Sequence, residues 1–196
     1  MSLLNRREVL CELLHERRDL IVVAGLGAPA YDLAACGNES LDFPLWGAMG
    51  GAAMVGLGLA LAQPQYKVLV LTGDGEMLMG LGSLATIGAQ QPPNLRIVVL
   101  DNECYGETGQ QPTHTAMGVD LEAIARGCGF QNTRTIRQAA ELGVLRQDMH
   151  TEAGLLFATV KVSPENLPRV LPPRDGPYLT QRLREALLGT EYALEG

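Results

Sequence analysis

Apolar residues along this chain follow two spacings, one typical of helices and one typical of buried strands. Short continuous apolar runs predict strands buried on both faces, at residues 20–24, 67–72, 95–101 and 155–162. Apolar residues at helical spacing predict helices at residues 6–17, 31–36, 47–62, 77–90, 121–126, 137–149 and 179–188. Buried strands separated by helices predict a doubly wound α/β fold, a single parallel sheet with helices on both faces.

The same pattern predicts one domain. No internal repeat, low-complexity segment or linker divides the sequence, and 196 residues are enough to bury a substantial core. We therefore expect the domain to cover residues 1–196, with a C-terminal proline-rich turn and helix at residues 171–196.

Composition excludes some classes of binding partner and indicates the cellular compartment. The net charge is −7 and no basic cluster offsets it, so nucleic acid and anionic membranes are poor candidate partners. The four cysteines form no CxxC pair, and neither a zinc site nor a disulfide framework is expected. The N-terminus shows no signal-peptide pattern, which indicates a cytoplasmic protein.

One uncharged stretch, residues 45–62, is long enough to raise the alternative of a membrane helix. It is rich in glycine and alanine, so its tendency to insert is weak, and no Lys/Arg cluster flanks it. A helix of small residues packed closely against the sheet explains this composition better.

Ligands of parallel sheets bind beyond the carboxyl ends of the strands, which selects the loops at residues 25–29, 73–76 and 101–115. The first loop carries Gly25, Gly27 and Ala30 at the spacing of a dinucleotide fingerprint. A ribose-binding acid should end the next apolar strand, but Asp42 follows residues 38–41, which do not read as a strand. A glycine turn that binds nothing is a further alternative.

The second and third loops form a candidate metal site. Asp74 lies between Gly73 and Gly75 after one strand, and Asn102 follows the next strand, with 26 residues between Gly75 and Asn102. A carboxylate and an amide oxygen suit Mg²⁺, which keeps its other positions for phosphate and water. The glycines and the following helix offer N–H groups to a diphosphate. Gly-Asp-Gly alone is common turn chemistry, so the spacing to Asn102 carries the argument.

That spacing resembles the signature of thiamine diphosphate enzymes. Residues 47–50, Gly-Ala-Met-Gly, look like the segment that bends the cofactor in that family. Residues 101–113 are similar to the metal loop of the sulfopyruvate and phosphonopyruvate decarboxylases. The resemblance runs from about residue 20 to 162 and is strongest for the separate β subunit of sulfopyruvate decarboxylase.

The resemblance implies a role for each matching position. Asp74, the side-chain oxygen of Asn102 and the backbone carbonyl of Cys104 would bind Mg²⁺. Gly75 and Glu76 would donate backbone N–H groups to the diphosphate. Glu76 departs from the small or hydroxyl residue often found there, and its carboxylate is expected to turn away from the diphosphate.

Further positions would complete the cofactor site. By the same resemblance, Met49 would support the bent cofactor, the carbonyl of Gly47 would accept from the aminopyrimidine, and Gly27 would lie near the diphosphate. Tyr105 either packs or lines the site. His114 is a candidate acid or substrate contact, with an exposed loop residue as the alternative reading. The remaining cofactor positions that match the motif are Gly73 and Gly106.

The resemblance also implies that half of the active site is elsewhere. The family's activating Glu belongs to a pyrimidine-binding domain, and nothing in this sequence looks like that domain. We therefore expect a separate α subunit as partner, alongside a β–β homodimer contact. The implied function is a thiamine diphosphate-dependent, non-oxidative decarboxylase of a small 2-oxo acid.

Two alternatives stay open, a subunit of a 2-oxo acid:ferredoxin-type oxidoreductase and a non-catalytic module that binds thiamine diphosphate. The sequence does not choose the substrate. No Lys or Arg lies between Arg96 and Arg126, although a sulfonate or phosphonate would invite one.

Overall fold

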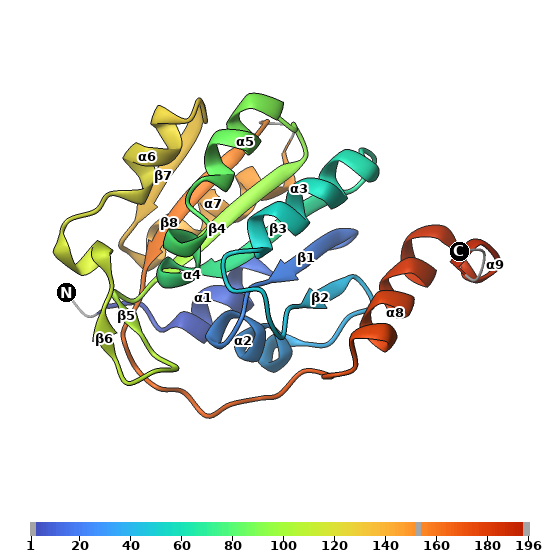
Figure 1. The fold of residues 1–196 in the computed structure, drawn as a ribbon, viewed down its shortest axis with the longest axis horizontal. Coiled ribbons are helices and arrows are strands. Elements are labelled where there is room, and N and C mark those ends of the chain that lie inside the picture. Colours follow the sequence, from blue (N-terminus) through green and yellow to red (C-terminus); the bar gives the residue numbers. More distant parts are fainter. Residues whose placement is uncertain (1–2, 152–153, 194–196) are drawn as a thin grey trace.

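The computed structural model of the chain describes residues 3–151 and 154–193 and contains one six-stranded parallel sheet (Figure 1). Its strand order is β2-β1-β3-β4-β8-β7, so the chain winds outward in both directions from β1 and β3. The strands are β1 (Leu20–Ala24), β2 (Asp42–Pro44), β3 (Lys67–Gly73), β4 (Leu95–Asp101), β7 (Asn132–Ile136) and β8 (Leu156–Lys161). The predicted α/β fold is confirmed.

Helices cover both faces of this sheet (Figure 1). One face carries α1 (Arg6–Leu13), α2 (Ala28–Cys36) and α7 (Leu142–His150). The other carries α3 (Ala52–Ala62), α4 (Asp74–Met79), α5 (Ser83–Gln90) and α6 (Leu121–Gly127). Each layer buries its apolar side chains against strands whose residues are almost all buried, giving two cores separated by the sheet.

The small-residue stretch forms α3, which packs on β3. A Cβ atom at Gly56 would lie 2.2 Å from the Cγ2 atom of Val70, closer than two non-bonded carbon atoms can approach. The glycine therefore permits the close contact between helix and strand. Across the described ranges, 3–151 and 154–193, no helix is long and apolar enough to cross a membrane.

The structure differs from the predicted elements in three places. The predicted helix at 77–90 is two helices, α4 and α5, because the chain bends at Gly80, where a Cβ would lie 2.1 Å from the carbonyl oxygen of Gly50. The edge strands β2 and β7 were not predicted. β2 has three residues, and β7 (NTRTI) is mostly polar and half-buried.

The expectation about disulfides also needs correction. Cys11 in α1 and Cys36 at the end of α2 form a disulfide, with their Cα atoms 5.3 Å apart. The two cysteines are 25 residues apart in sequence and come together because α1 packs along α2. Cysteine spacing could not show this, since the contact is between helices. Cys104 and Cys128 are free thiols.

After β8 the chain crosses the molecule as an extended C-terminal strap (residues 163–175) before α8 (Gly176–Leu188) and α9 (Thr190–Ala193) (Figure 1). The Arg7 guanidinium donates to the carbonyl of Pro168 at 2.6 Å, and the Trp46 indole donates to the carbonyl of Pro173 at 2.7 Å. These contacts hold the strap beyond the carboxyl ends of the strands. The closing helix α8 packs beside β2.

Candidate functional site

A cavity of about 660 Å³ opens at the carboxyl ends of β1, β3 and β4. Most of the residues proposed from the sequence line it: Met49, Gly73, Asp74, Gly75, Glu76, Asn102, Cys104, Tyr105 and Gly106. Gly27 does not line the cavity itself, although its neighbours Leu26 and Ala28 do. Gly47 does not line the cavity either. His114 is exposed at the start of the 3₁₀ helix His114–Met117 and does not line the cavity.

Asp74 is the most constrained acid in this cavity. It is 1% exposed, and the hydroxyls of Thr113 and Thr115 both donate to its Oδ2 atom. The Thr115 Oγ1 atom also lies 2.8 Å from the Asp101 Oδ1 atom, so one threonine lies between two buried carboxylates and its single proton serves one of them at a time. Burial raises the pKa of Asp74 to about 6, and the Asp101 charge adds to the rise while the threonine hydrogen bonds oppose it.

These residues fit a divalent cation. Among the described residues no Lys or Arg forms an ion pair with Asp74, so its buried negative charge has no counter-charge. Asn102 and Cys104 line the same cavity and supply an amide oxygen and a backbone carbonyl. Within 3–151 and 154–193 no group of three His, Cys, Asp or Glu side chains could hold a metal, so a cation here would rely on mixed oxygen donors.

The turn after Asn102 is shaped to present these oxygens. The Asn102 Oδ1 atom accepts from the backbone N–H of Cys104 at 3.3 Å, and Glu103 takes a left-handed φ of 61°. The chain then forms a small antiparallel hairpin from β5 (Cys104–Tyr105) and β6 (Gln111–Pro112). That hairpin leads directly to the two threonines that hold Asp74.

Gly75 is required by the ring of Tyr105. A Cβ atom at Gly75 would lie 2.5 Å from the Tyr105 Cε1 atom, so only glycine lets the ring pack on the first turn of α4. Tyr105 thus both packs and lines the cavity. No side chain caps α4, whose first N–H groups lie at the cavity and favour an anion.

Glu76 is 3% exposed, and its Oε2 atom accepts from the Thr72 hydroxyl at 2.9 Å. The carboxylate fills the space beside Gly25, where an added Cβ would lie 1.7 Å from Oε2. Its Oε1 atom makes no hydrogen bond within the described part of the chain, and burial raises the pKa of this carboxyl. The side chain therefore points toward β1 and β3.

The structure adds residues that the sequence analysis did not select. Thr113 and Thr115 hold Asp74, and their Thr-x-Thr spacing in a candidate loop was the available signal. Arg6 lines the cavity and forms a buried ion pair with Asp32. Arg169 reaches the cavity from the C-terminal strap. Nothing local in the sequence marks these two arginines, because the contacts join segments far apart in the chain.

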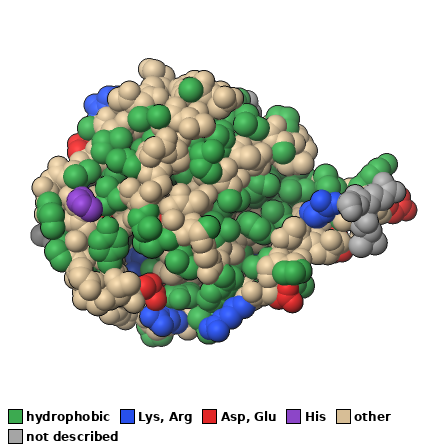
Figure 2. Space-filling model, viewed as in Figure 1, with side chains coloured by type: hydrophobic (Ala, Val, Ile, Leu, Met, Phe, Trp, Pro, Cys, Tyr) green, Lys and Arg blue, Asp and Glu red, His purple; other side chains and the backbone are tan. Residues whose placement is uncertain are grey.

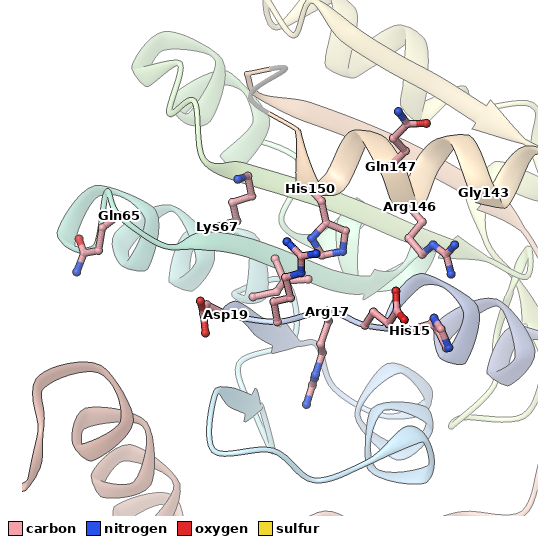
Figure 3. A pocket seen from close by; sticks show the side chains of 12 residues that line it. His15, Arg17, Asp19, Gln65, Lys67, Gly143, Arg146, Gln147 and His150 are labelled. Carbon is pink, nitrogen blue, oxygen red and sulfur yellow. The ribbon is translucent and has the colours of Figure 1, made fainter.

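A second cavity, of about 560 Å³, lies at the opposite edge of the sheet, where β1 and β3 begin (Figure 3). Arg17, Lys67, Arg146 and His150 gather around it. Arg17 is paired with Asp42 at 2.5 Å and Arg146 with Glu12 at 3.1 Å. Two of the cations around this second cavity therefore form ion pairs within the protein. Ligands of parallel sheets bind at the carboxyl ends of strands, which favours the first cavity.

Asp42 lies on the wrong side for the dinucleotide alternative. It begins β2 and pairs with Val22 and Arg17, away from the carboxyl end of β1. A ribose-binding acid would have to stand at the carboxyl end of the second strand, and Asp42 is the first residue of that strand.

Comparison with known families agrees with the cavity's geometry. The family model described as thiamine pyrophosphate enzyme, C-terminal TPP binding domain, matches residues 26–157. The chain belongs to this family. The matched segment of this thiamine pyrophosphate-binding domain contains Asp74, Asn102 and both threonines that hold Asp74.

Several relatives are decarboxylases by name, and weaker matches are an acetolactate synthase and a 2-oxoglutarate oxidoreductase subunit. The chain is 41% identical over 164 residues to a sulfopyruvate decarboxylase subunit beta from Methanothermobacter thermautotrophicus, covering 84% of this chain and 85% of the relative. It is 35% identical over 182 residues to a sulfopyruvate decarboxylase from Methanosarcina acetivorans, covering 93% of this chain and 47% of the relative. The chain thus spans about half the length of that second relative.

A solved structure from Mycobacterium smegmatis, provisionally described as a thiamin diphosphate-dependent enzyme, shares the fold. The TM-score is 0.68 at 22% sequence identity, covering 83% of this chain and 32% of the other.

Proposed function

We propose that the chain is the diphosphate-binding subunit of a thiamine diphosphate- and Mg²⁺-dependent, non-oxidative 2-oxo acid decarboxylase. The observation that carries this proposal is that Asp74, Asn102 and Cys104 line one cavity beside an uncapped helix start. Family membership supports the cofactor, and the mixed oxygen donors support the metal.

In this proposal the chain's residues bind and orient. Asp74, Asn102 and the Cys104 carbonyl would hold Mg²⁺, and the N–H groups of Gly75 and Glu76 would meet the diphosphate. Gly47 and Met49 would meet the other half of the cofactor. Thiamine diphosphate, when bound, supplies the ring that accepts the electron pair released as CO₂ leaves.

A partner subunit is needed to supply the activating acid. Among the described residues, two glutamates line the cavity, Glu76 and Glu107. The Glu76 carboxyl is buried against Thr72 and Gly25, and Glu107 is paired with Arg169. Glu76 is not free to reach the aminopyrimidine, and relatives are named beta subunits, so we infer that the acid comes from a separate pyrimidine-binding subunit.

An exposed apolar surface supports such a partner. Met49, Met54 and Met79 are 38%, 42% and 62% exposed and come from the segment before α3, from α3 and from α4. Figure 2 shows hydrophobic side chains gathered over the region where Figure 1 has α3 and α4. Methionine-rich exposed surfaces adapt to partners, and Met49 and Met79 also line the cavity. A β–β contact could use another surface.

We further propose a cytoplasmic location. The Cys11–Cys36 disulfide counts against this location, since disulfides persist mainly in oxidising compartments, and in a reducing cytoplasm both residues would be thiols.

The test is the reaction without an electron acceptor. The chain and its partner should release CO₂ from a 2-oxo acid and yield an equal amount of aldehyde, measured by coupled assay and NMR. Strict dependence on ferredoxin or a viologen dye would favour the oxidoreductase alternative. Cofactor binding without any turnover would favour a non-catalytic module.

A further inference from the structure

The C-terminal strap forms one wall of the cofactor cavity. Asn166, Leu167 and Arg169 line the cavity, although they follow the last strand of the sheet. Asn166 accepts a hydrogen bond from the side chain of Gln110 at 3.0 Å, which ties the strap to the loop that follows Asn102. The strap is therefore a built part of the cavity.

Arg169 is held at this wall by two contacts. Its guanidinium carbon lies 5.5 Å from the centre of the Tyr31 ring, and its Nη2 atom lies 2.9 Å from the Glu107 Oε2 atom. The Arg169 and Glu107 side chains are 60% and 43% exposed. Ion pairs this exposed are weak, so a stronger anion can displace the Glu107 carboxylate.

The charges around the cavity make Arg169 the cation available to a ligand. The other cation in the lining, Arg6, is buried in an ion pair with Asp32. The acids Asp74, Glu76 and Glu107 share the lining, so an anionic ligand needs a cation to offset them. The Glu107 stem also lies against the Gly27 turn, where α2 begins.

We propose that Arg169 leaves Glu107 and binds a tetrahedral oxyanion of the ligand in this cavity. This inference rests on the proposed function. The planar guanidinium can donate two parallel hydrogen bonds to such a group. Two sources share this chemistry, the diphosphate of the cofactor and a phosphonate or sulfonate on the 2-oxo acid substrate. The strap thereby supplies the cation that the segment between Arg96 and Arg126 lacks.

The first experiment compares two arginines of the same strap. Arg169→Ala and the control Arg174→Ala each remove an arginine stacked on an aromatic ring, since Arg174 lies over Trp46. Only Arg169 lines the cavity. If the oxyanion is the diphosphate, calorimetry with Mg²⁺ and inorganic diphosphate on the full chain should show affinity about tenfold weaker in Arg169→Ala and within about twofold of the parent in Arg174→Ala.

A second variant separates binding from a structural ion pair. Glu107→Gln removes the partner of Arg169 but keeps its size, so diphosphate binding should become equal or tighter. A purely structural pair would make Arg169→Ala and Glu107→Gln weaken binding alike. That result, or no effect of Arg169→Ala on any ligand below, would overturn the proposal.

The source of the oxyanion is decided on the complex with the partner subunit. If Arg169 meets the cofactor, Arg169→Ala raises the Kd of thiamine diphosphate but not that of thiamine. If it meets the substrate, Arg169→Ala raises the KM of sulfopyruvate or phosphonopyruvate and leaves the KM of pyruvate unchanged. If diphosphate binding depends on Arg169 but the complex releases no CO₂, the inference about Arg169 stands and the proposed decarboxylase function is wrong. If the complex releases CO₂ and Arg169→Ala changes none of these constants, the decarboxylase proposal stands and the inference about Arg169 is wrong.

Discussion

At the scale of single residues, Asp74 combines burial with a missing counter-charge. Thr113 and Thr115 fix its carboxylate, and Asp101 lies close enough to raise its pKa. Asp101 has the Lys161 ammonium as its counter-charge at 2.7 Å, whereas no ion pair of the described residues involves Asp74, and a buried carboxylate is costly to keep ionised without a cation. The missing counter-charge of Asp74 supports the proposed metal, and a Gly-Asp-Gly pattern alone could not reveal it.

Asp74→Ala should abolish Mg²⁺-dependent binding of thiamine diphosphate and leave the fold intact. No neighbouring oxygen can replace the lost carboxylate, while Thr113 and Thr115 can still bond each other, at 2.9 Å in the parent. Calorimetry on the assembled complex measures the binding, and circular dichroism checks the fold. Asp74→Asn keeps an acceptor for the threonines, so its loss of binding isolates the charge. Parental affinity in either variant would refute the metal assignment.

The raised pKa of Asp74 also predicts a pH dependence. The folded value of about 6 lies above the ordinary 3.8, so ionisation costs folded-state stability as the pH rises from about 4 through 6. Mg²⁺ binds the ionised carboxylate and competes with the proton. Stabilisation by Mg²⁺ and thiamine diphosphate, followed by thermal melting, should be larger at pH 7.5 than at pH 5. Equal stabilisation at both values would contradict this assignment of the titrating group.

At the scale of elements, helix α3 contains one buried glycine and one exposed glycine, whose substitutions can be compared. Gly56 faces Val70 at contact distance, whereas a Cβ on exposed Gly58 meets nothing within 4 Å. Gly56→Ala should cost about 1–3 kcal/mol through overpacking. Gly58→Ala should stabilise by up to about 1 kcal/mol, because alanine favours helix. Chemical denaturation of both variants measures the difference, and two equal effects would refute the packing account.

Elements also show where sequence reasoning succeeds. The strands β1, β3, β4 and β8 were predictable because each is a continuous apolar run buried on both faces. β7 was missed because its polar residues carry no period and its pairing with β8 comes from the sheet. The loops after β3 and β4 were found because parallel topology places them together.

Residues supplied by distant segments could not be predicted in the same way. The sequence analysis selected Asp74 and Asn102 from local motifs. Arg169 enters the cavity only because the strap returns across the carboxyl ends of the strands. The Cys11–Cys36 bond depends likewise on how two helices pack. Such contacts have no signature in spacing or composition.

At the scale of the whole molecule, the cofactor cavity is lined by the exposed Met49 and Met79, and the one glutamate in its lining that is buried against the sheet is Glu76. A cofactor held here would have its diphosphate clamped and its pyrimidine half facing water. If the proposed function holds, the chain binds one end of the cofactor and its activity depends on a second subunit.

The isolated chain should accordingly be catalytically silent. Without a carboxylic acid beside the aminopyrimidine, the proton on the thiazolium carbon should exchange at nearly the rate of free cofactor. Hydrogen–deuterium exchange at that carbon, followed by NMR, is measured with the chain alone and then with its α-type partner. We expect fast exchange only with the partner, together with tighter cofactor binding, since the partner closes the open wall over Met49 and Met79. Met49→Ala should lower the partner-dependent exchange rate more than it lowers the affinity for the cofactor. The substitution removes support from the bent cofactor and leaves the diphosphate contacts in place. Fast exchange by the chain alone would show that an acid of this sequence reaches the pyrimidine, and Glu107, once released by Arg169, would be the first to replace by glutamine.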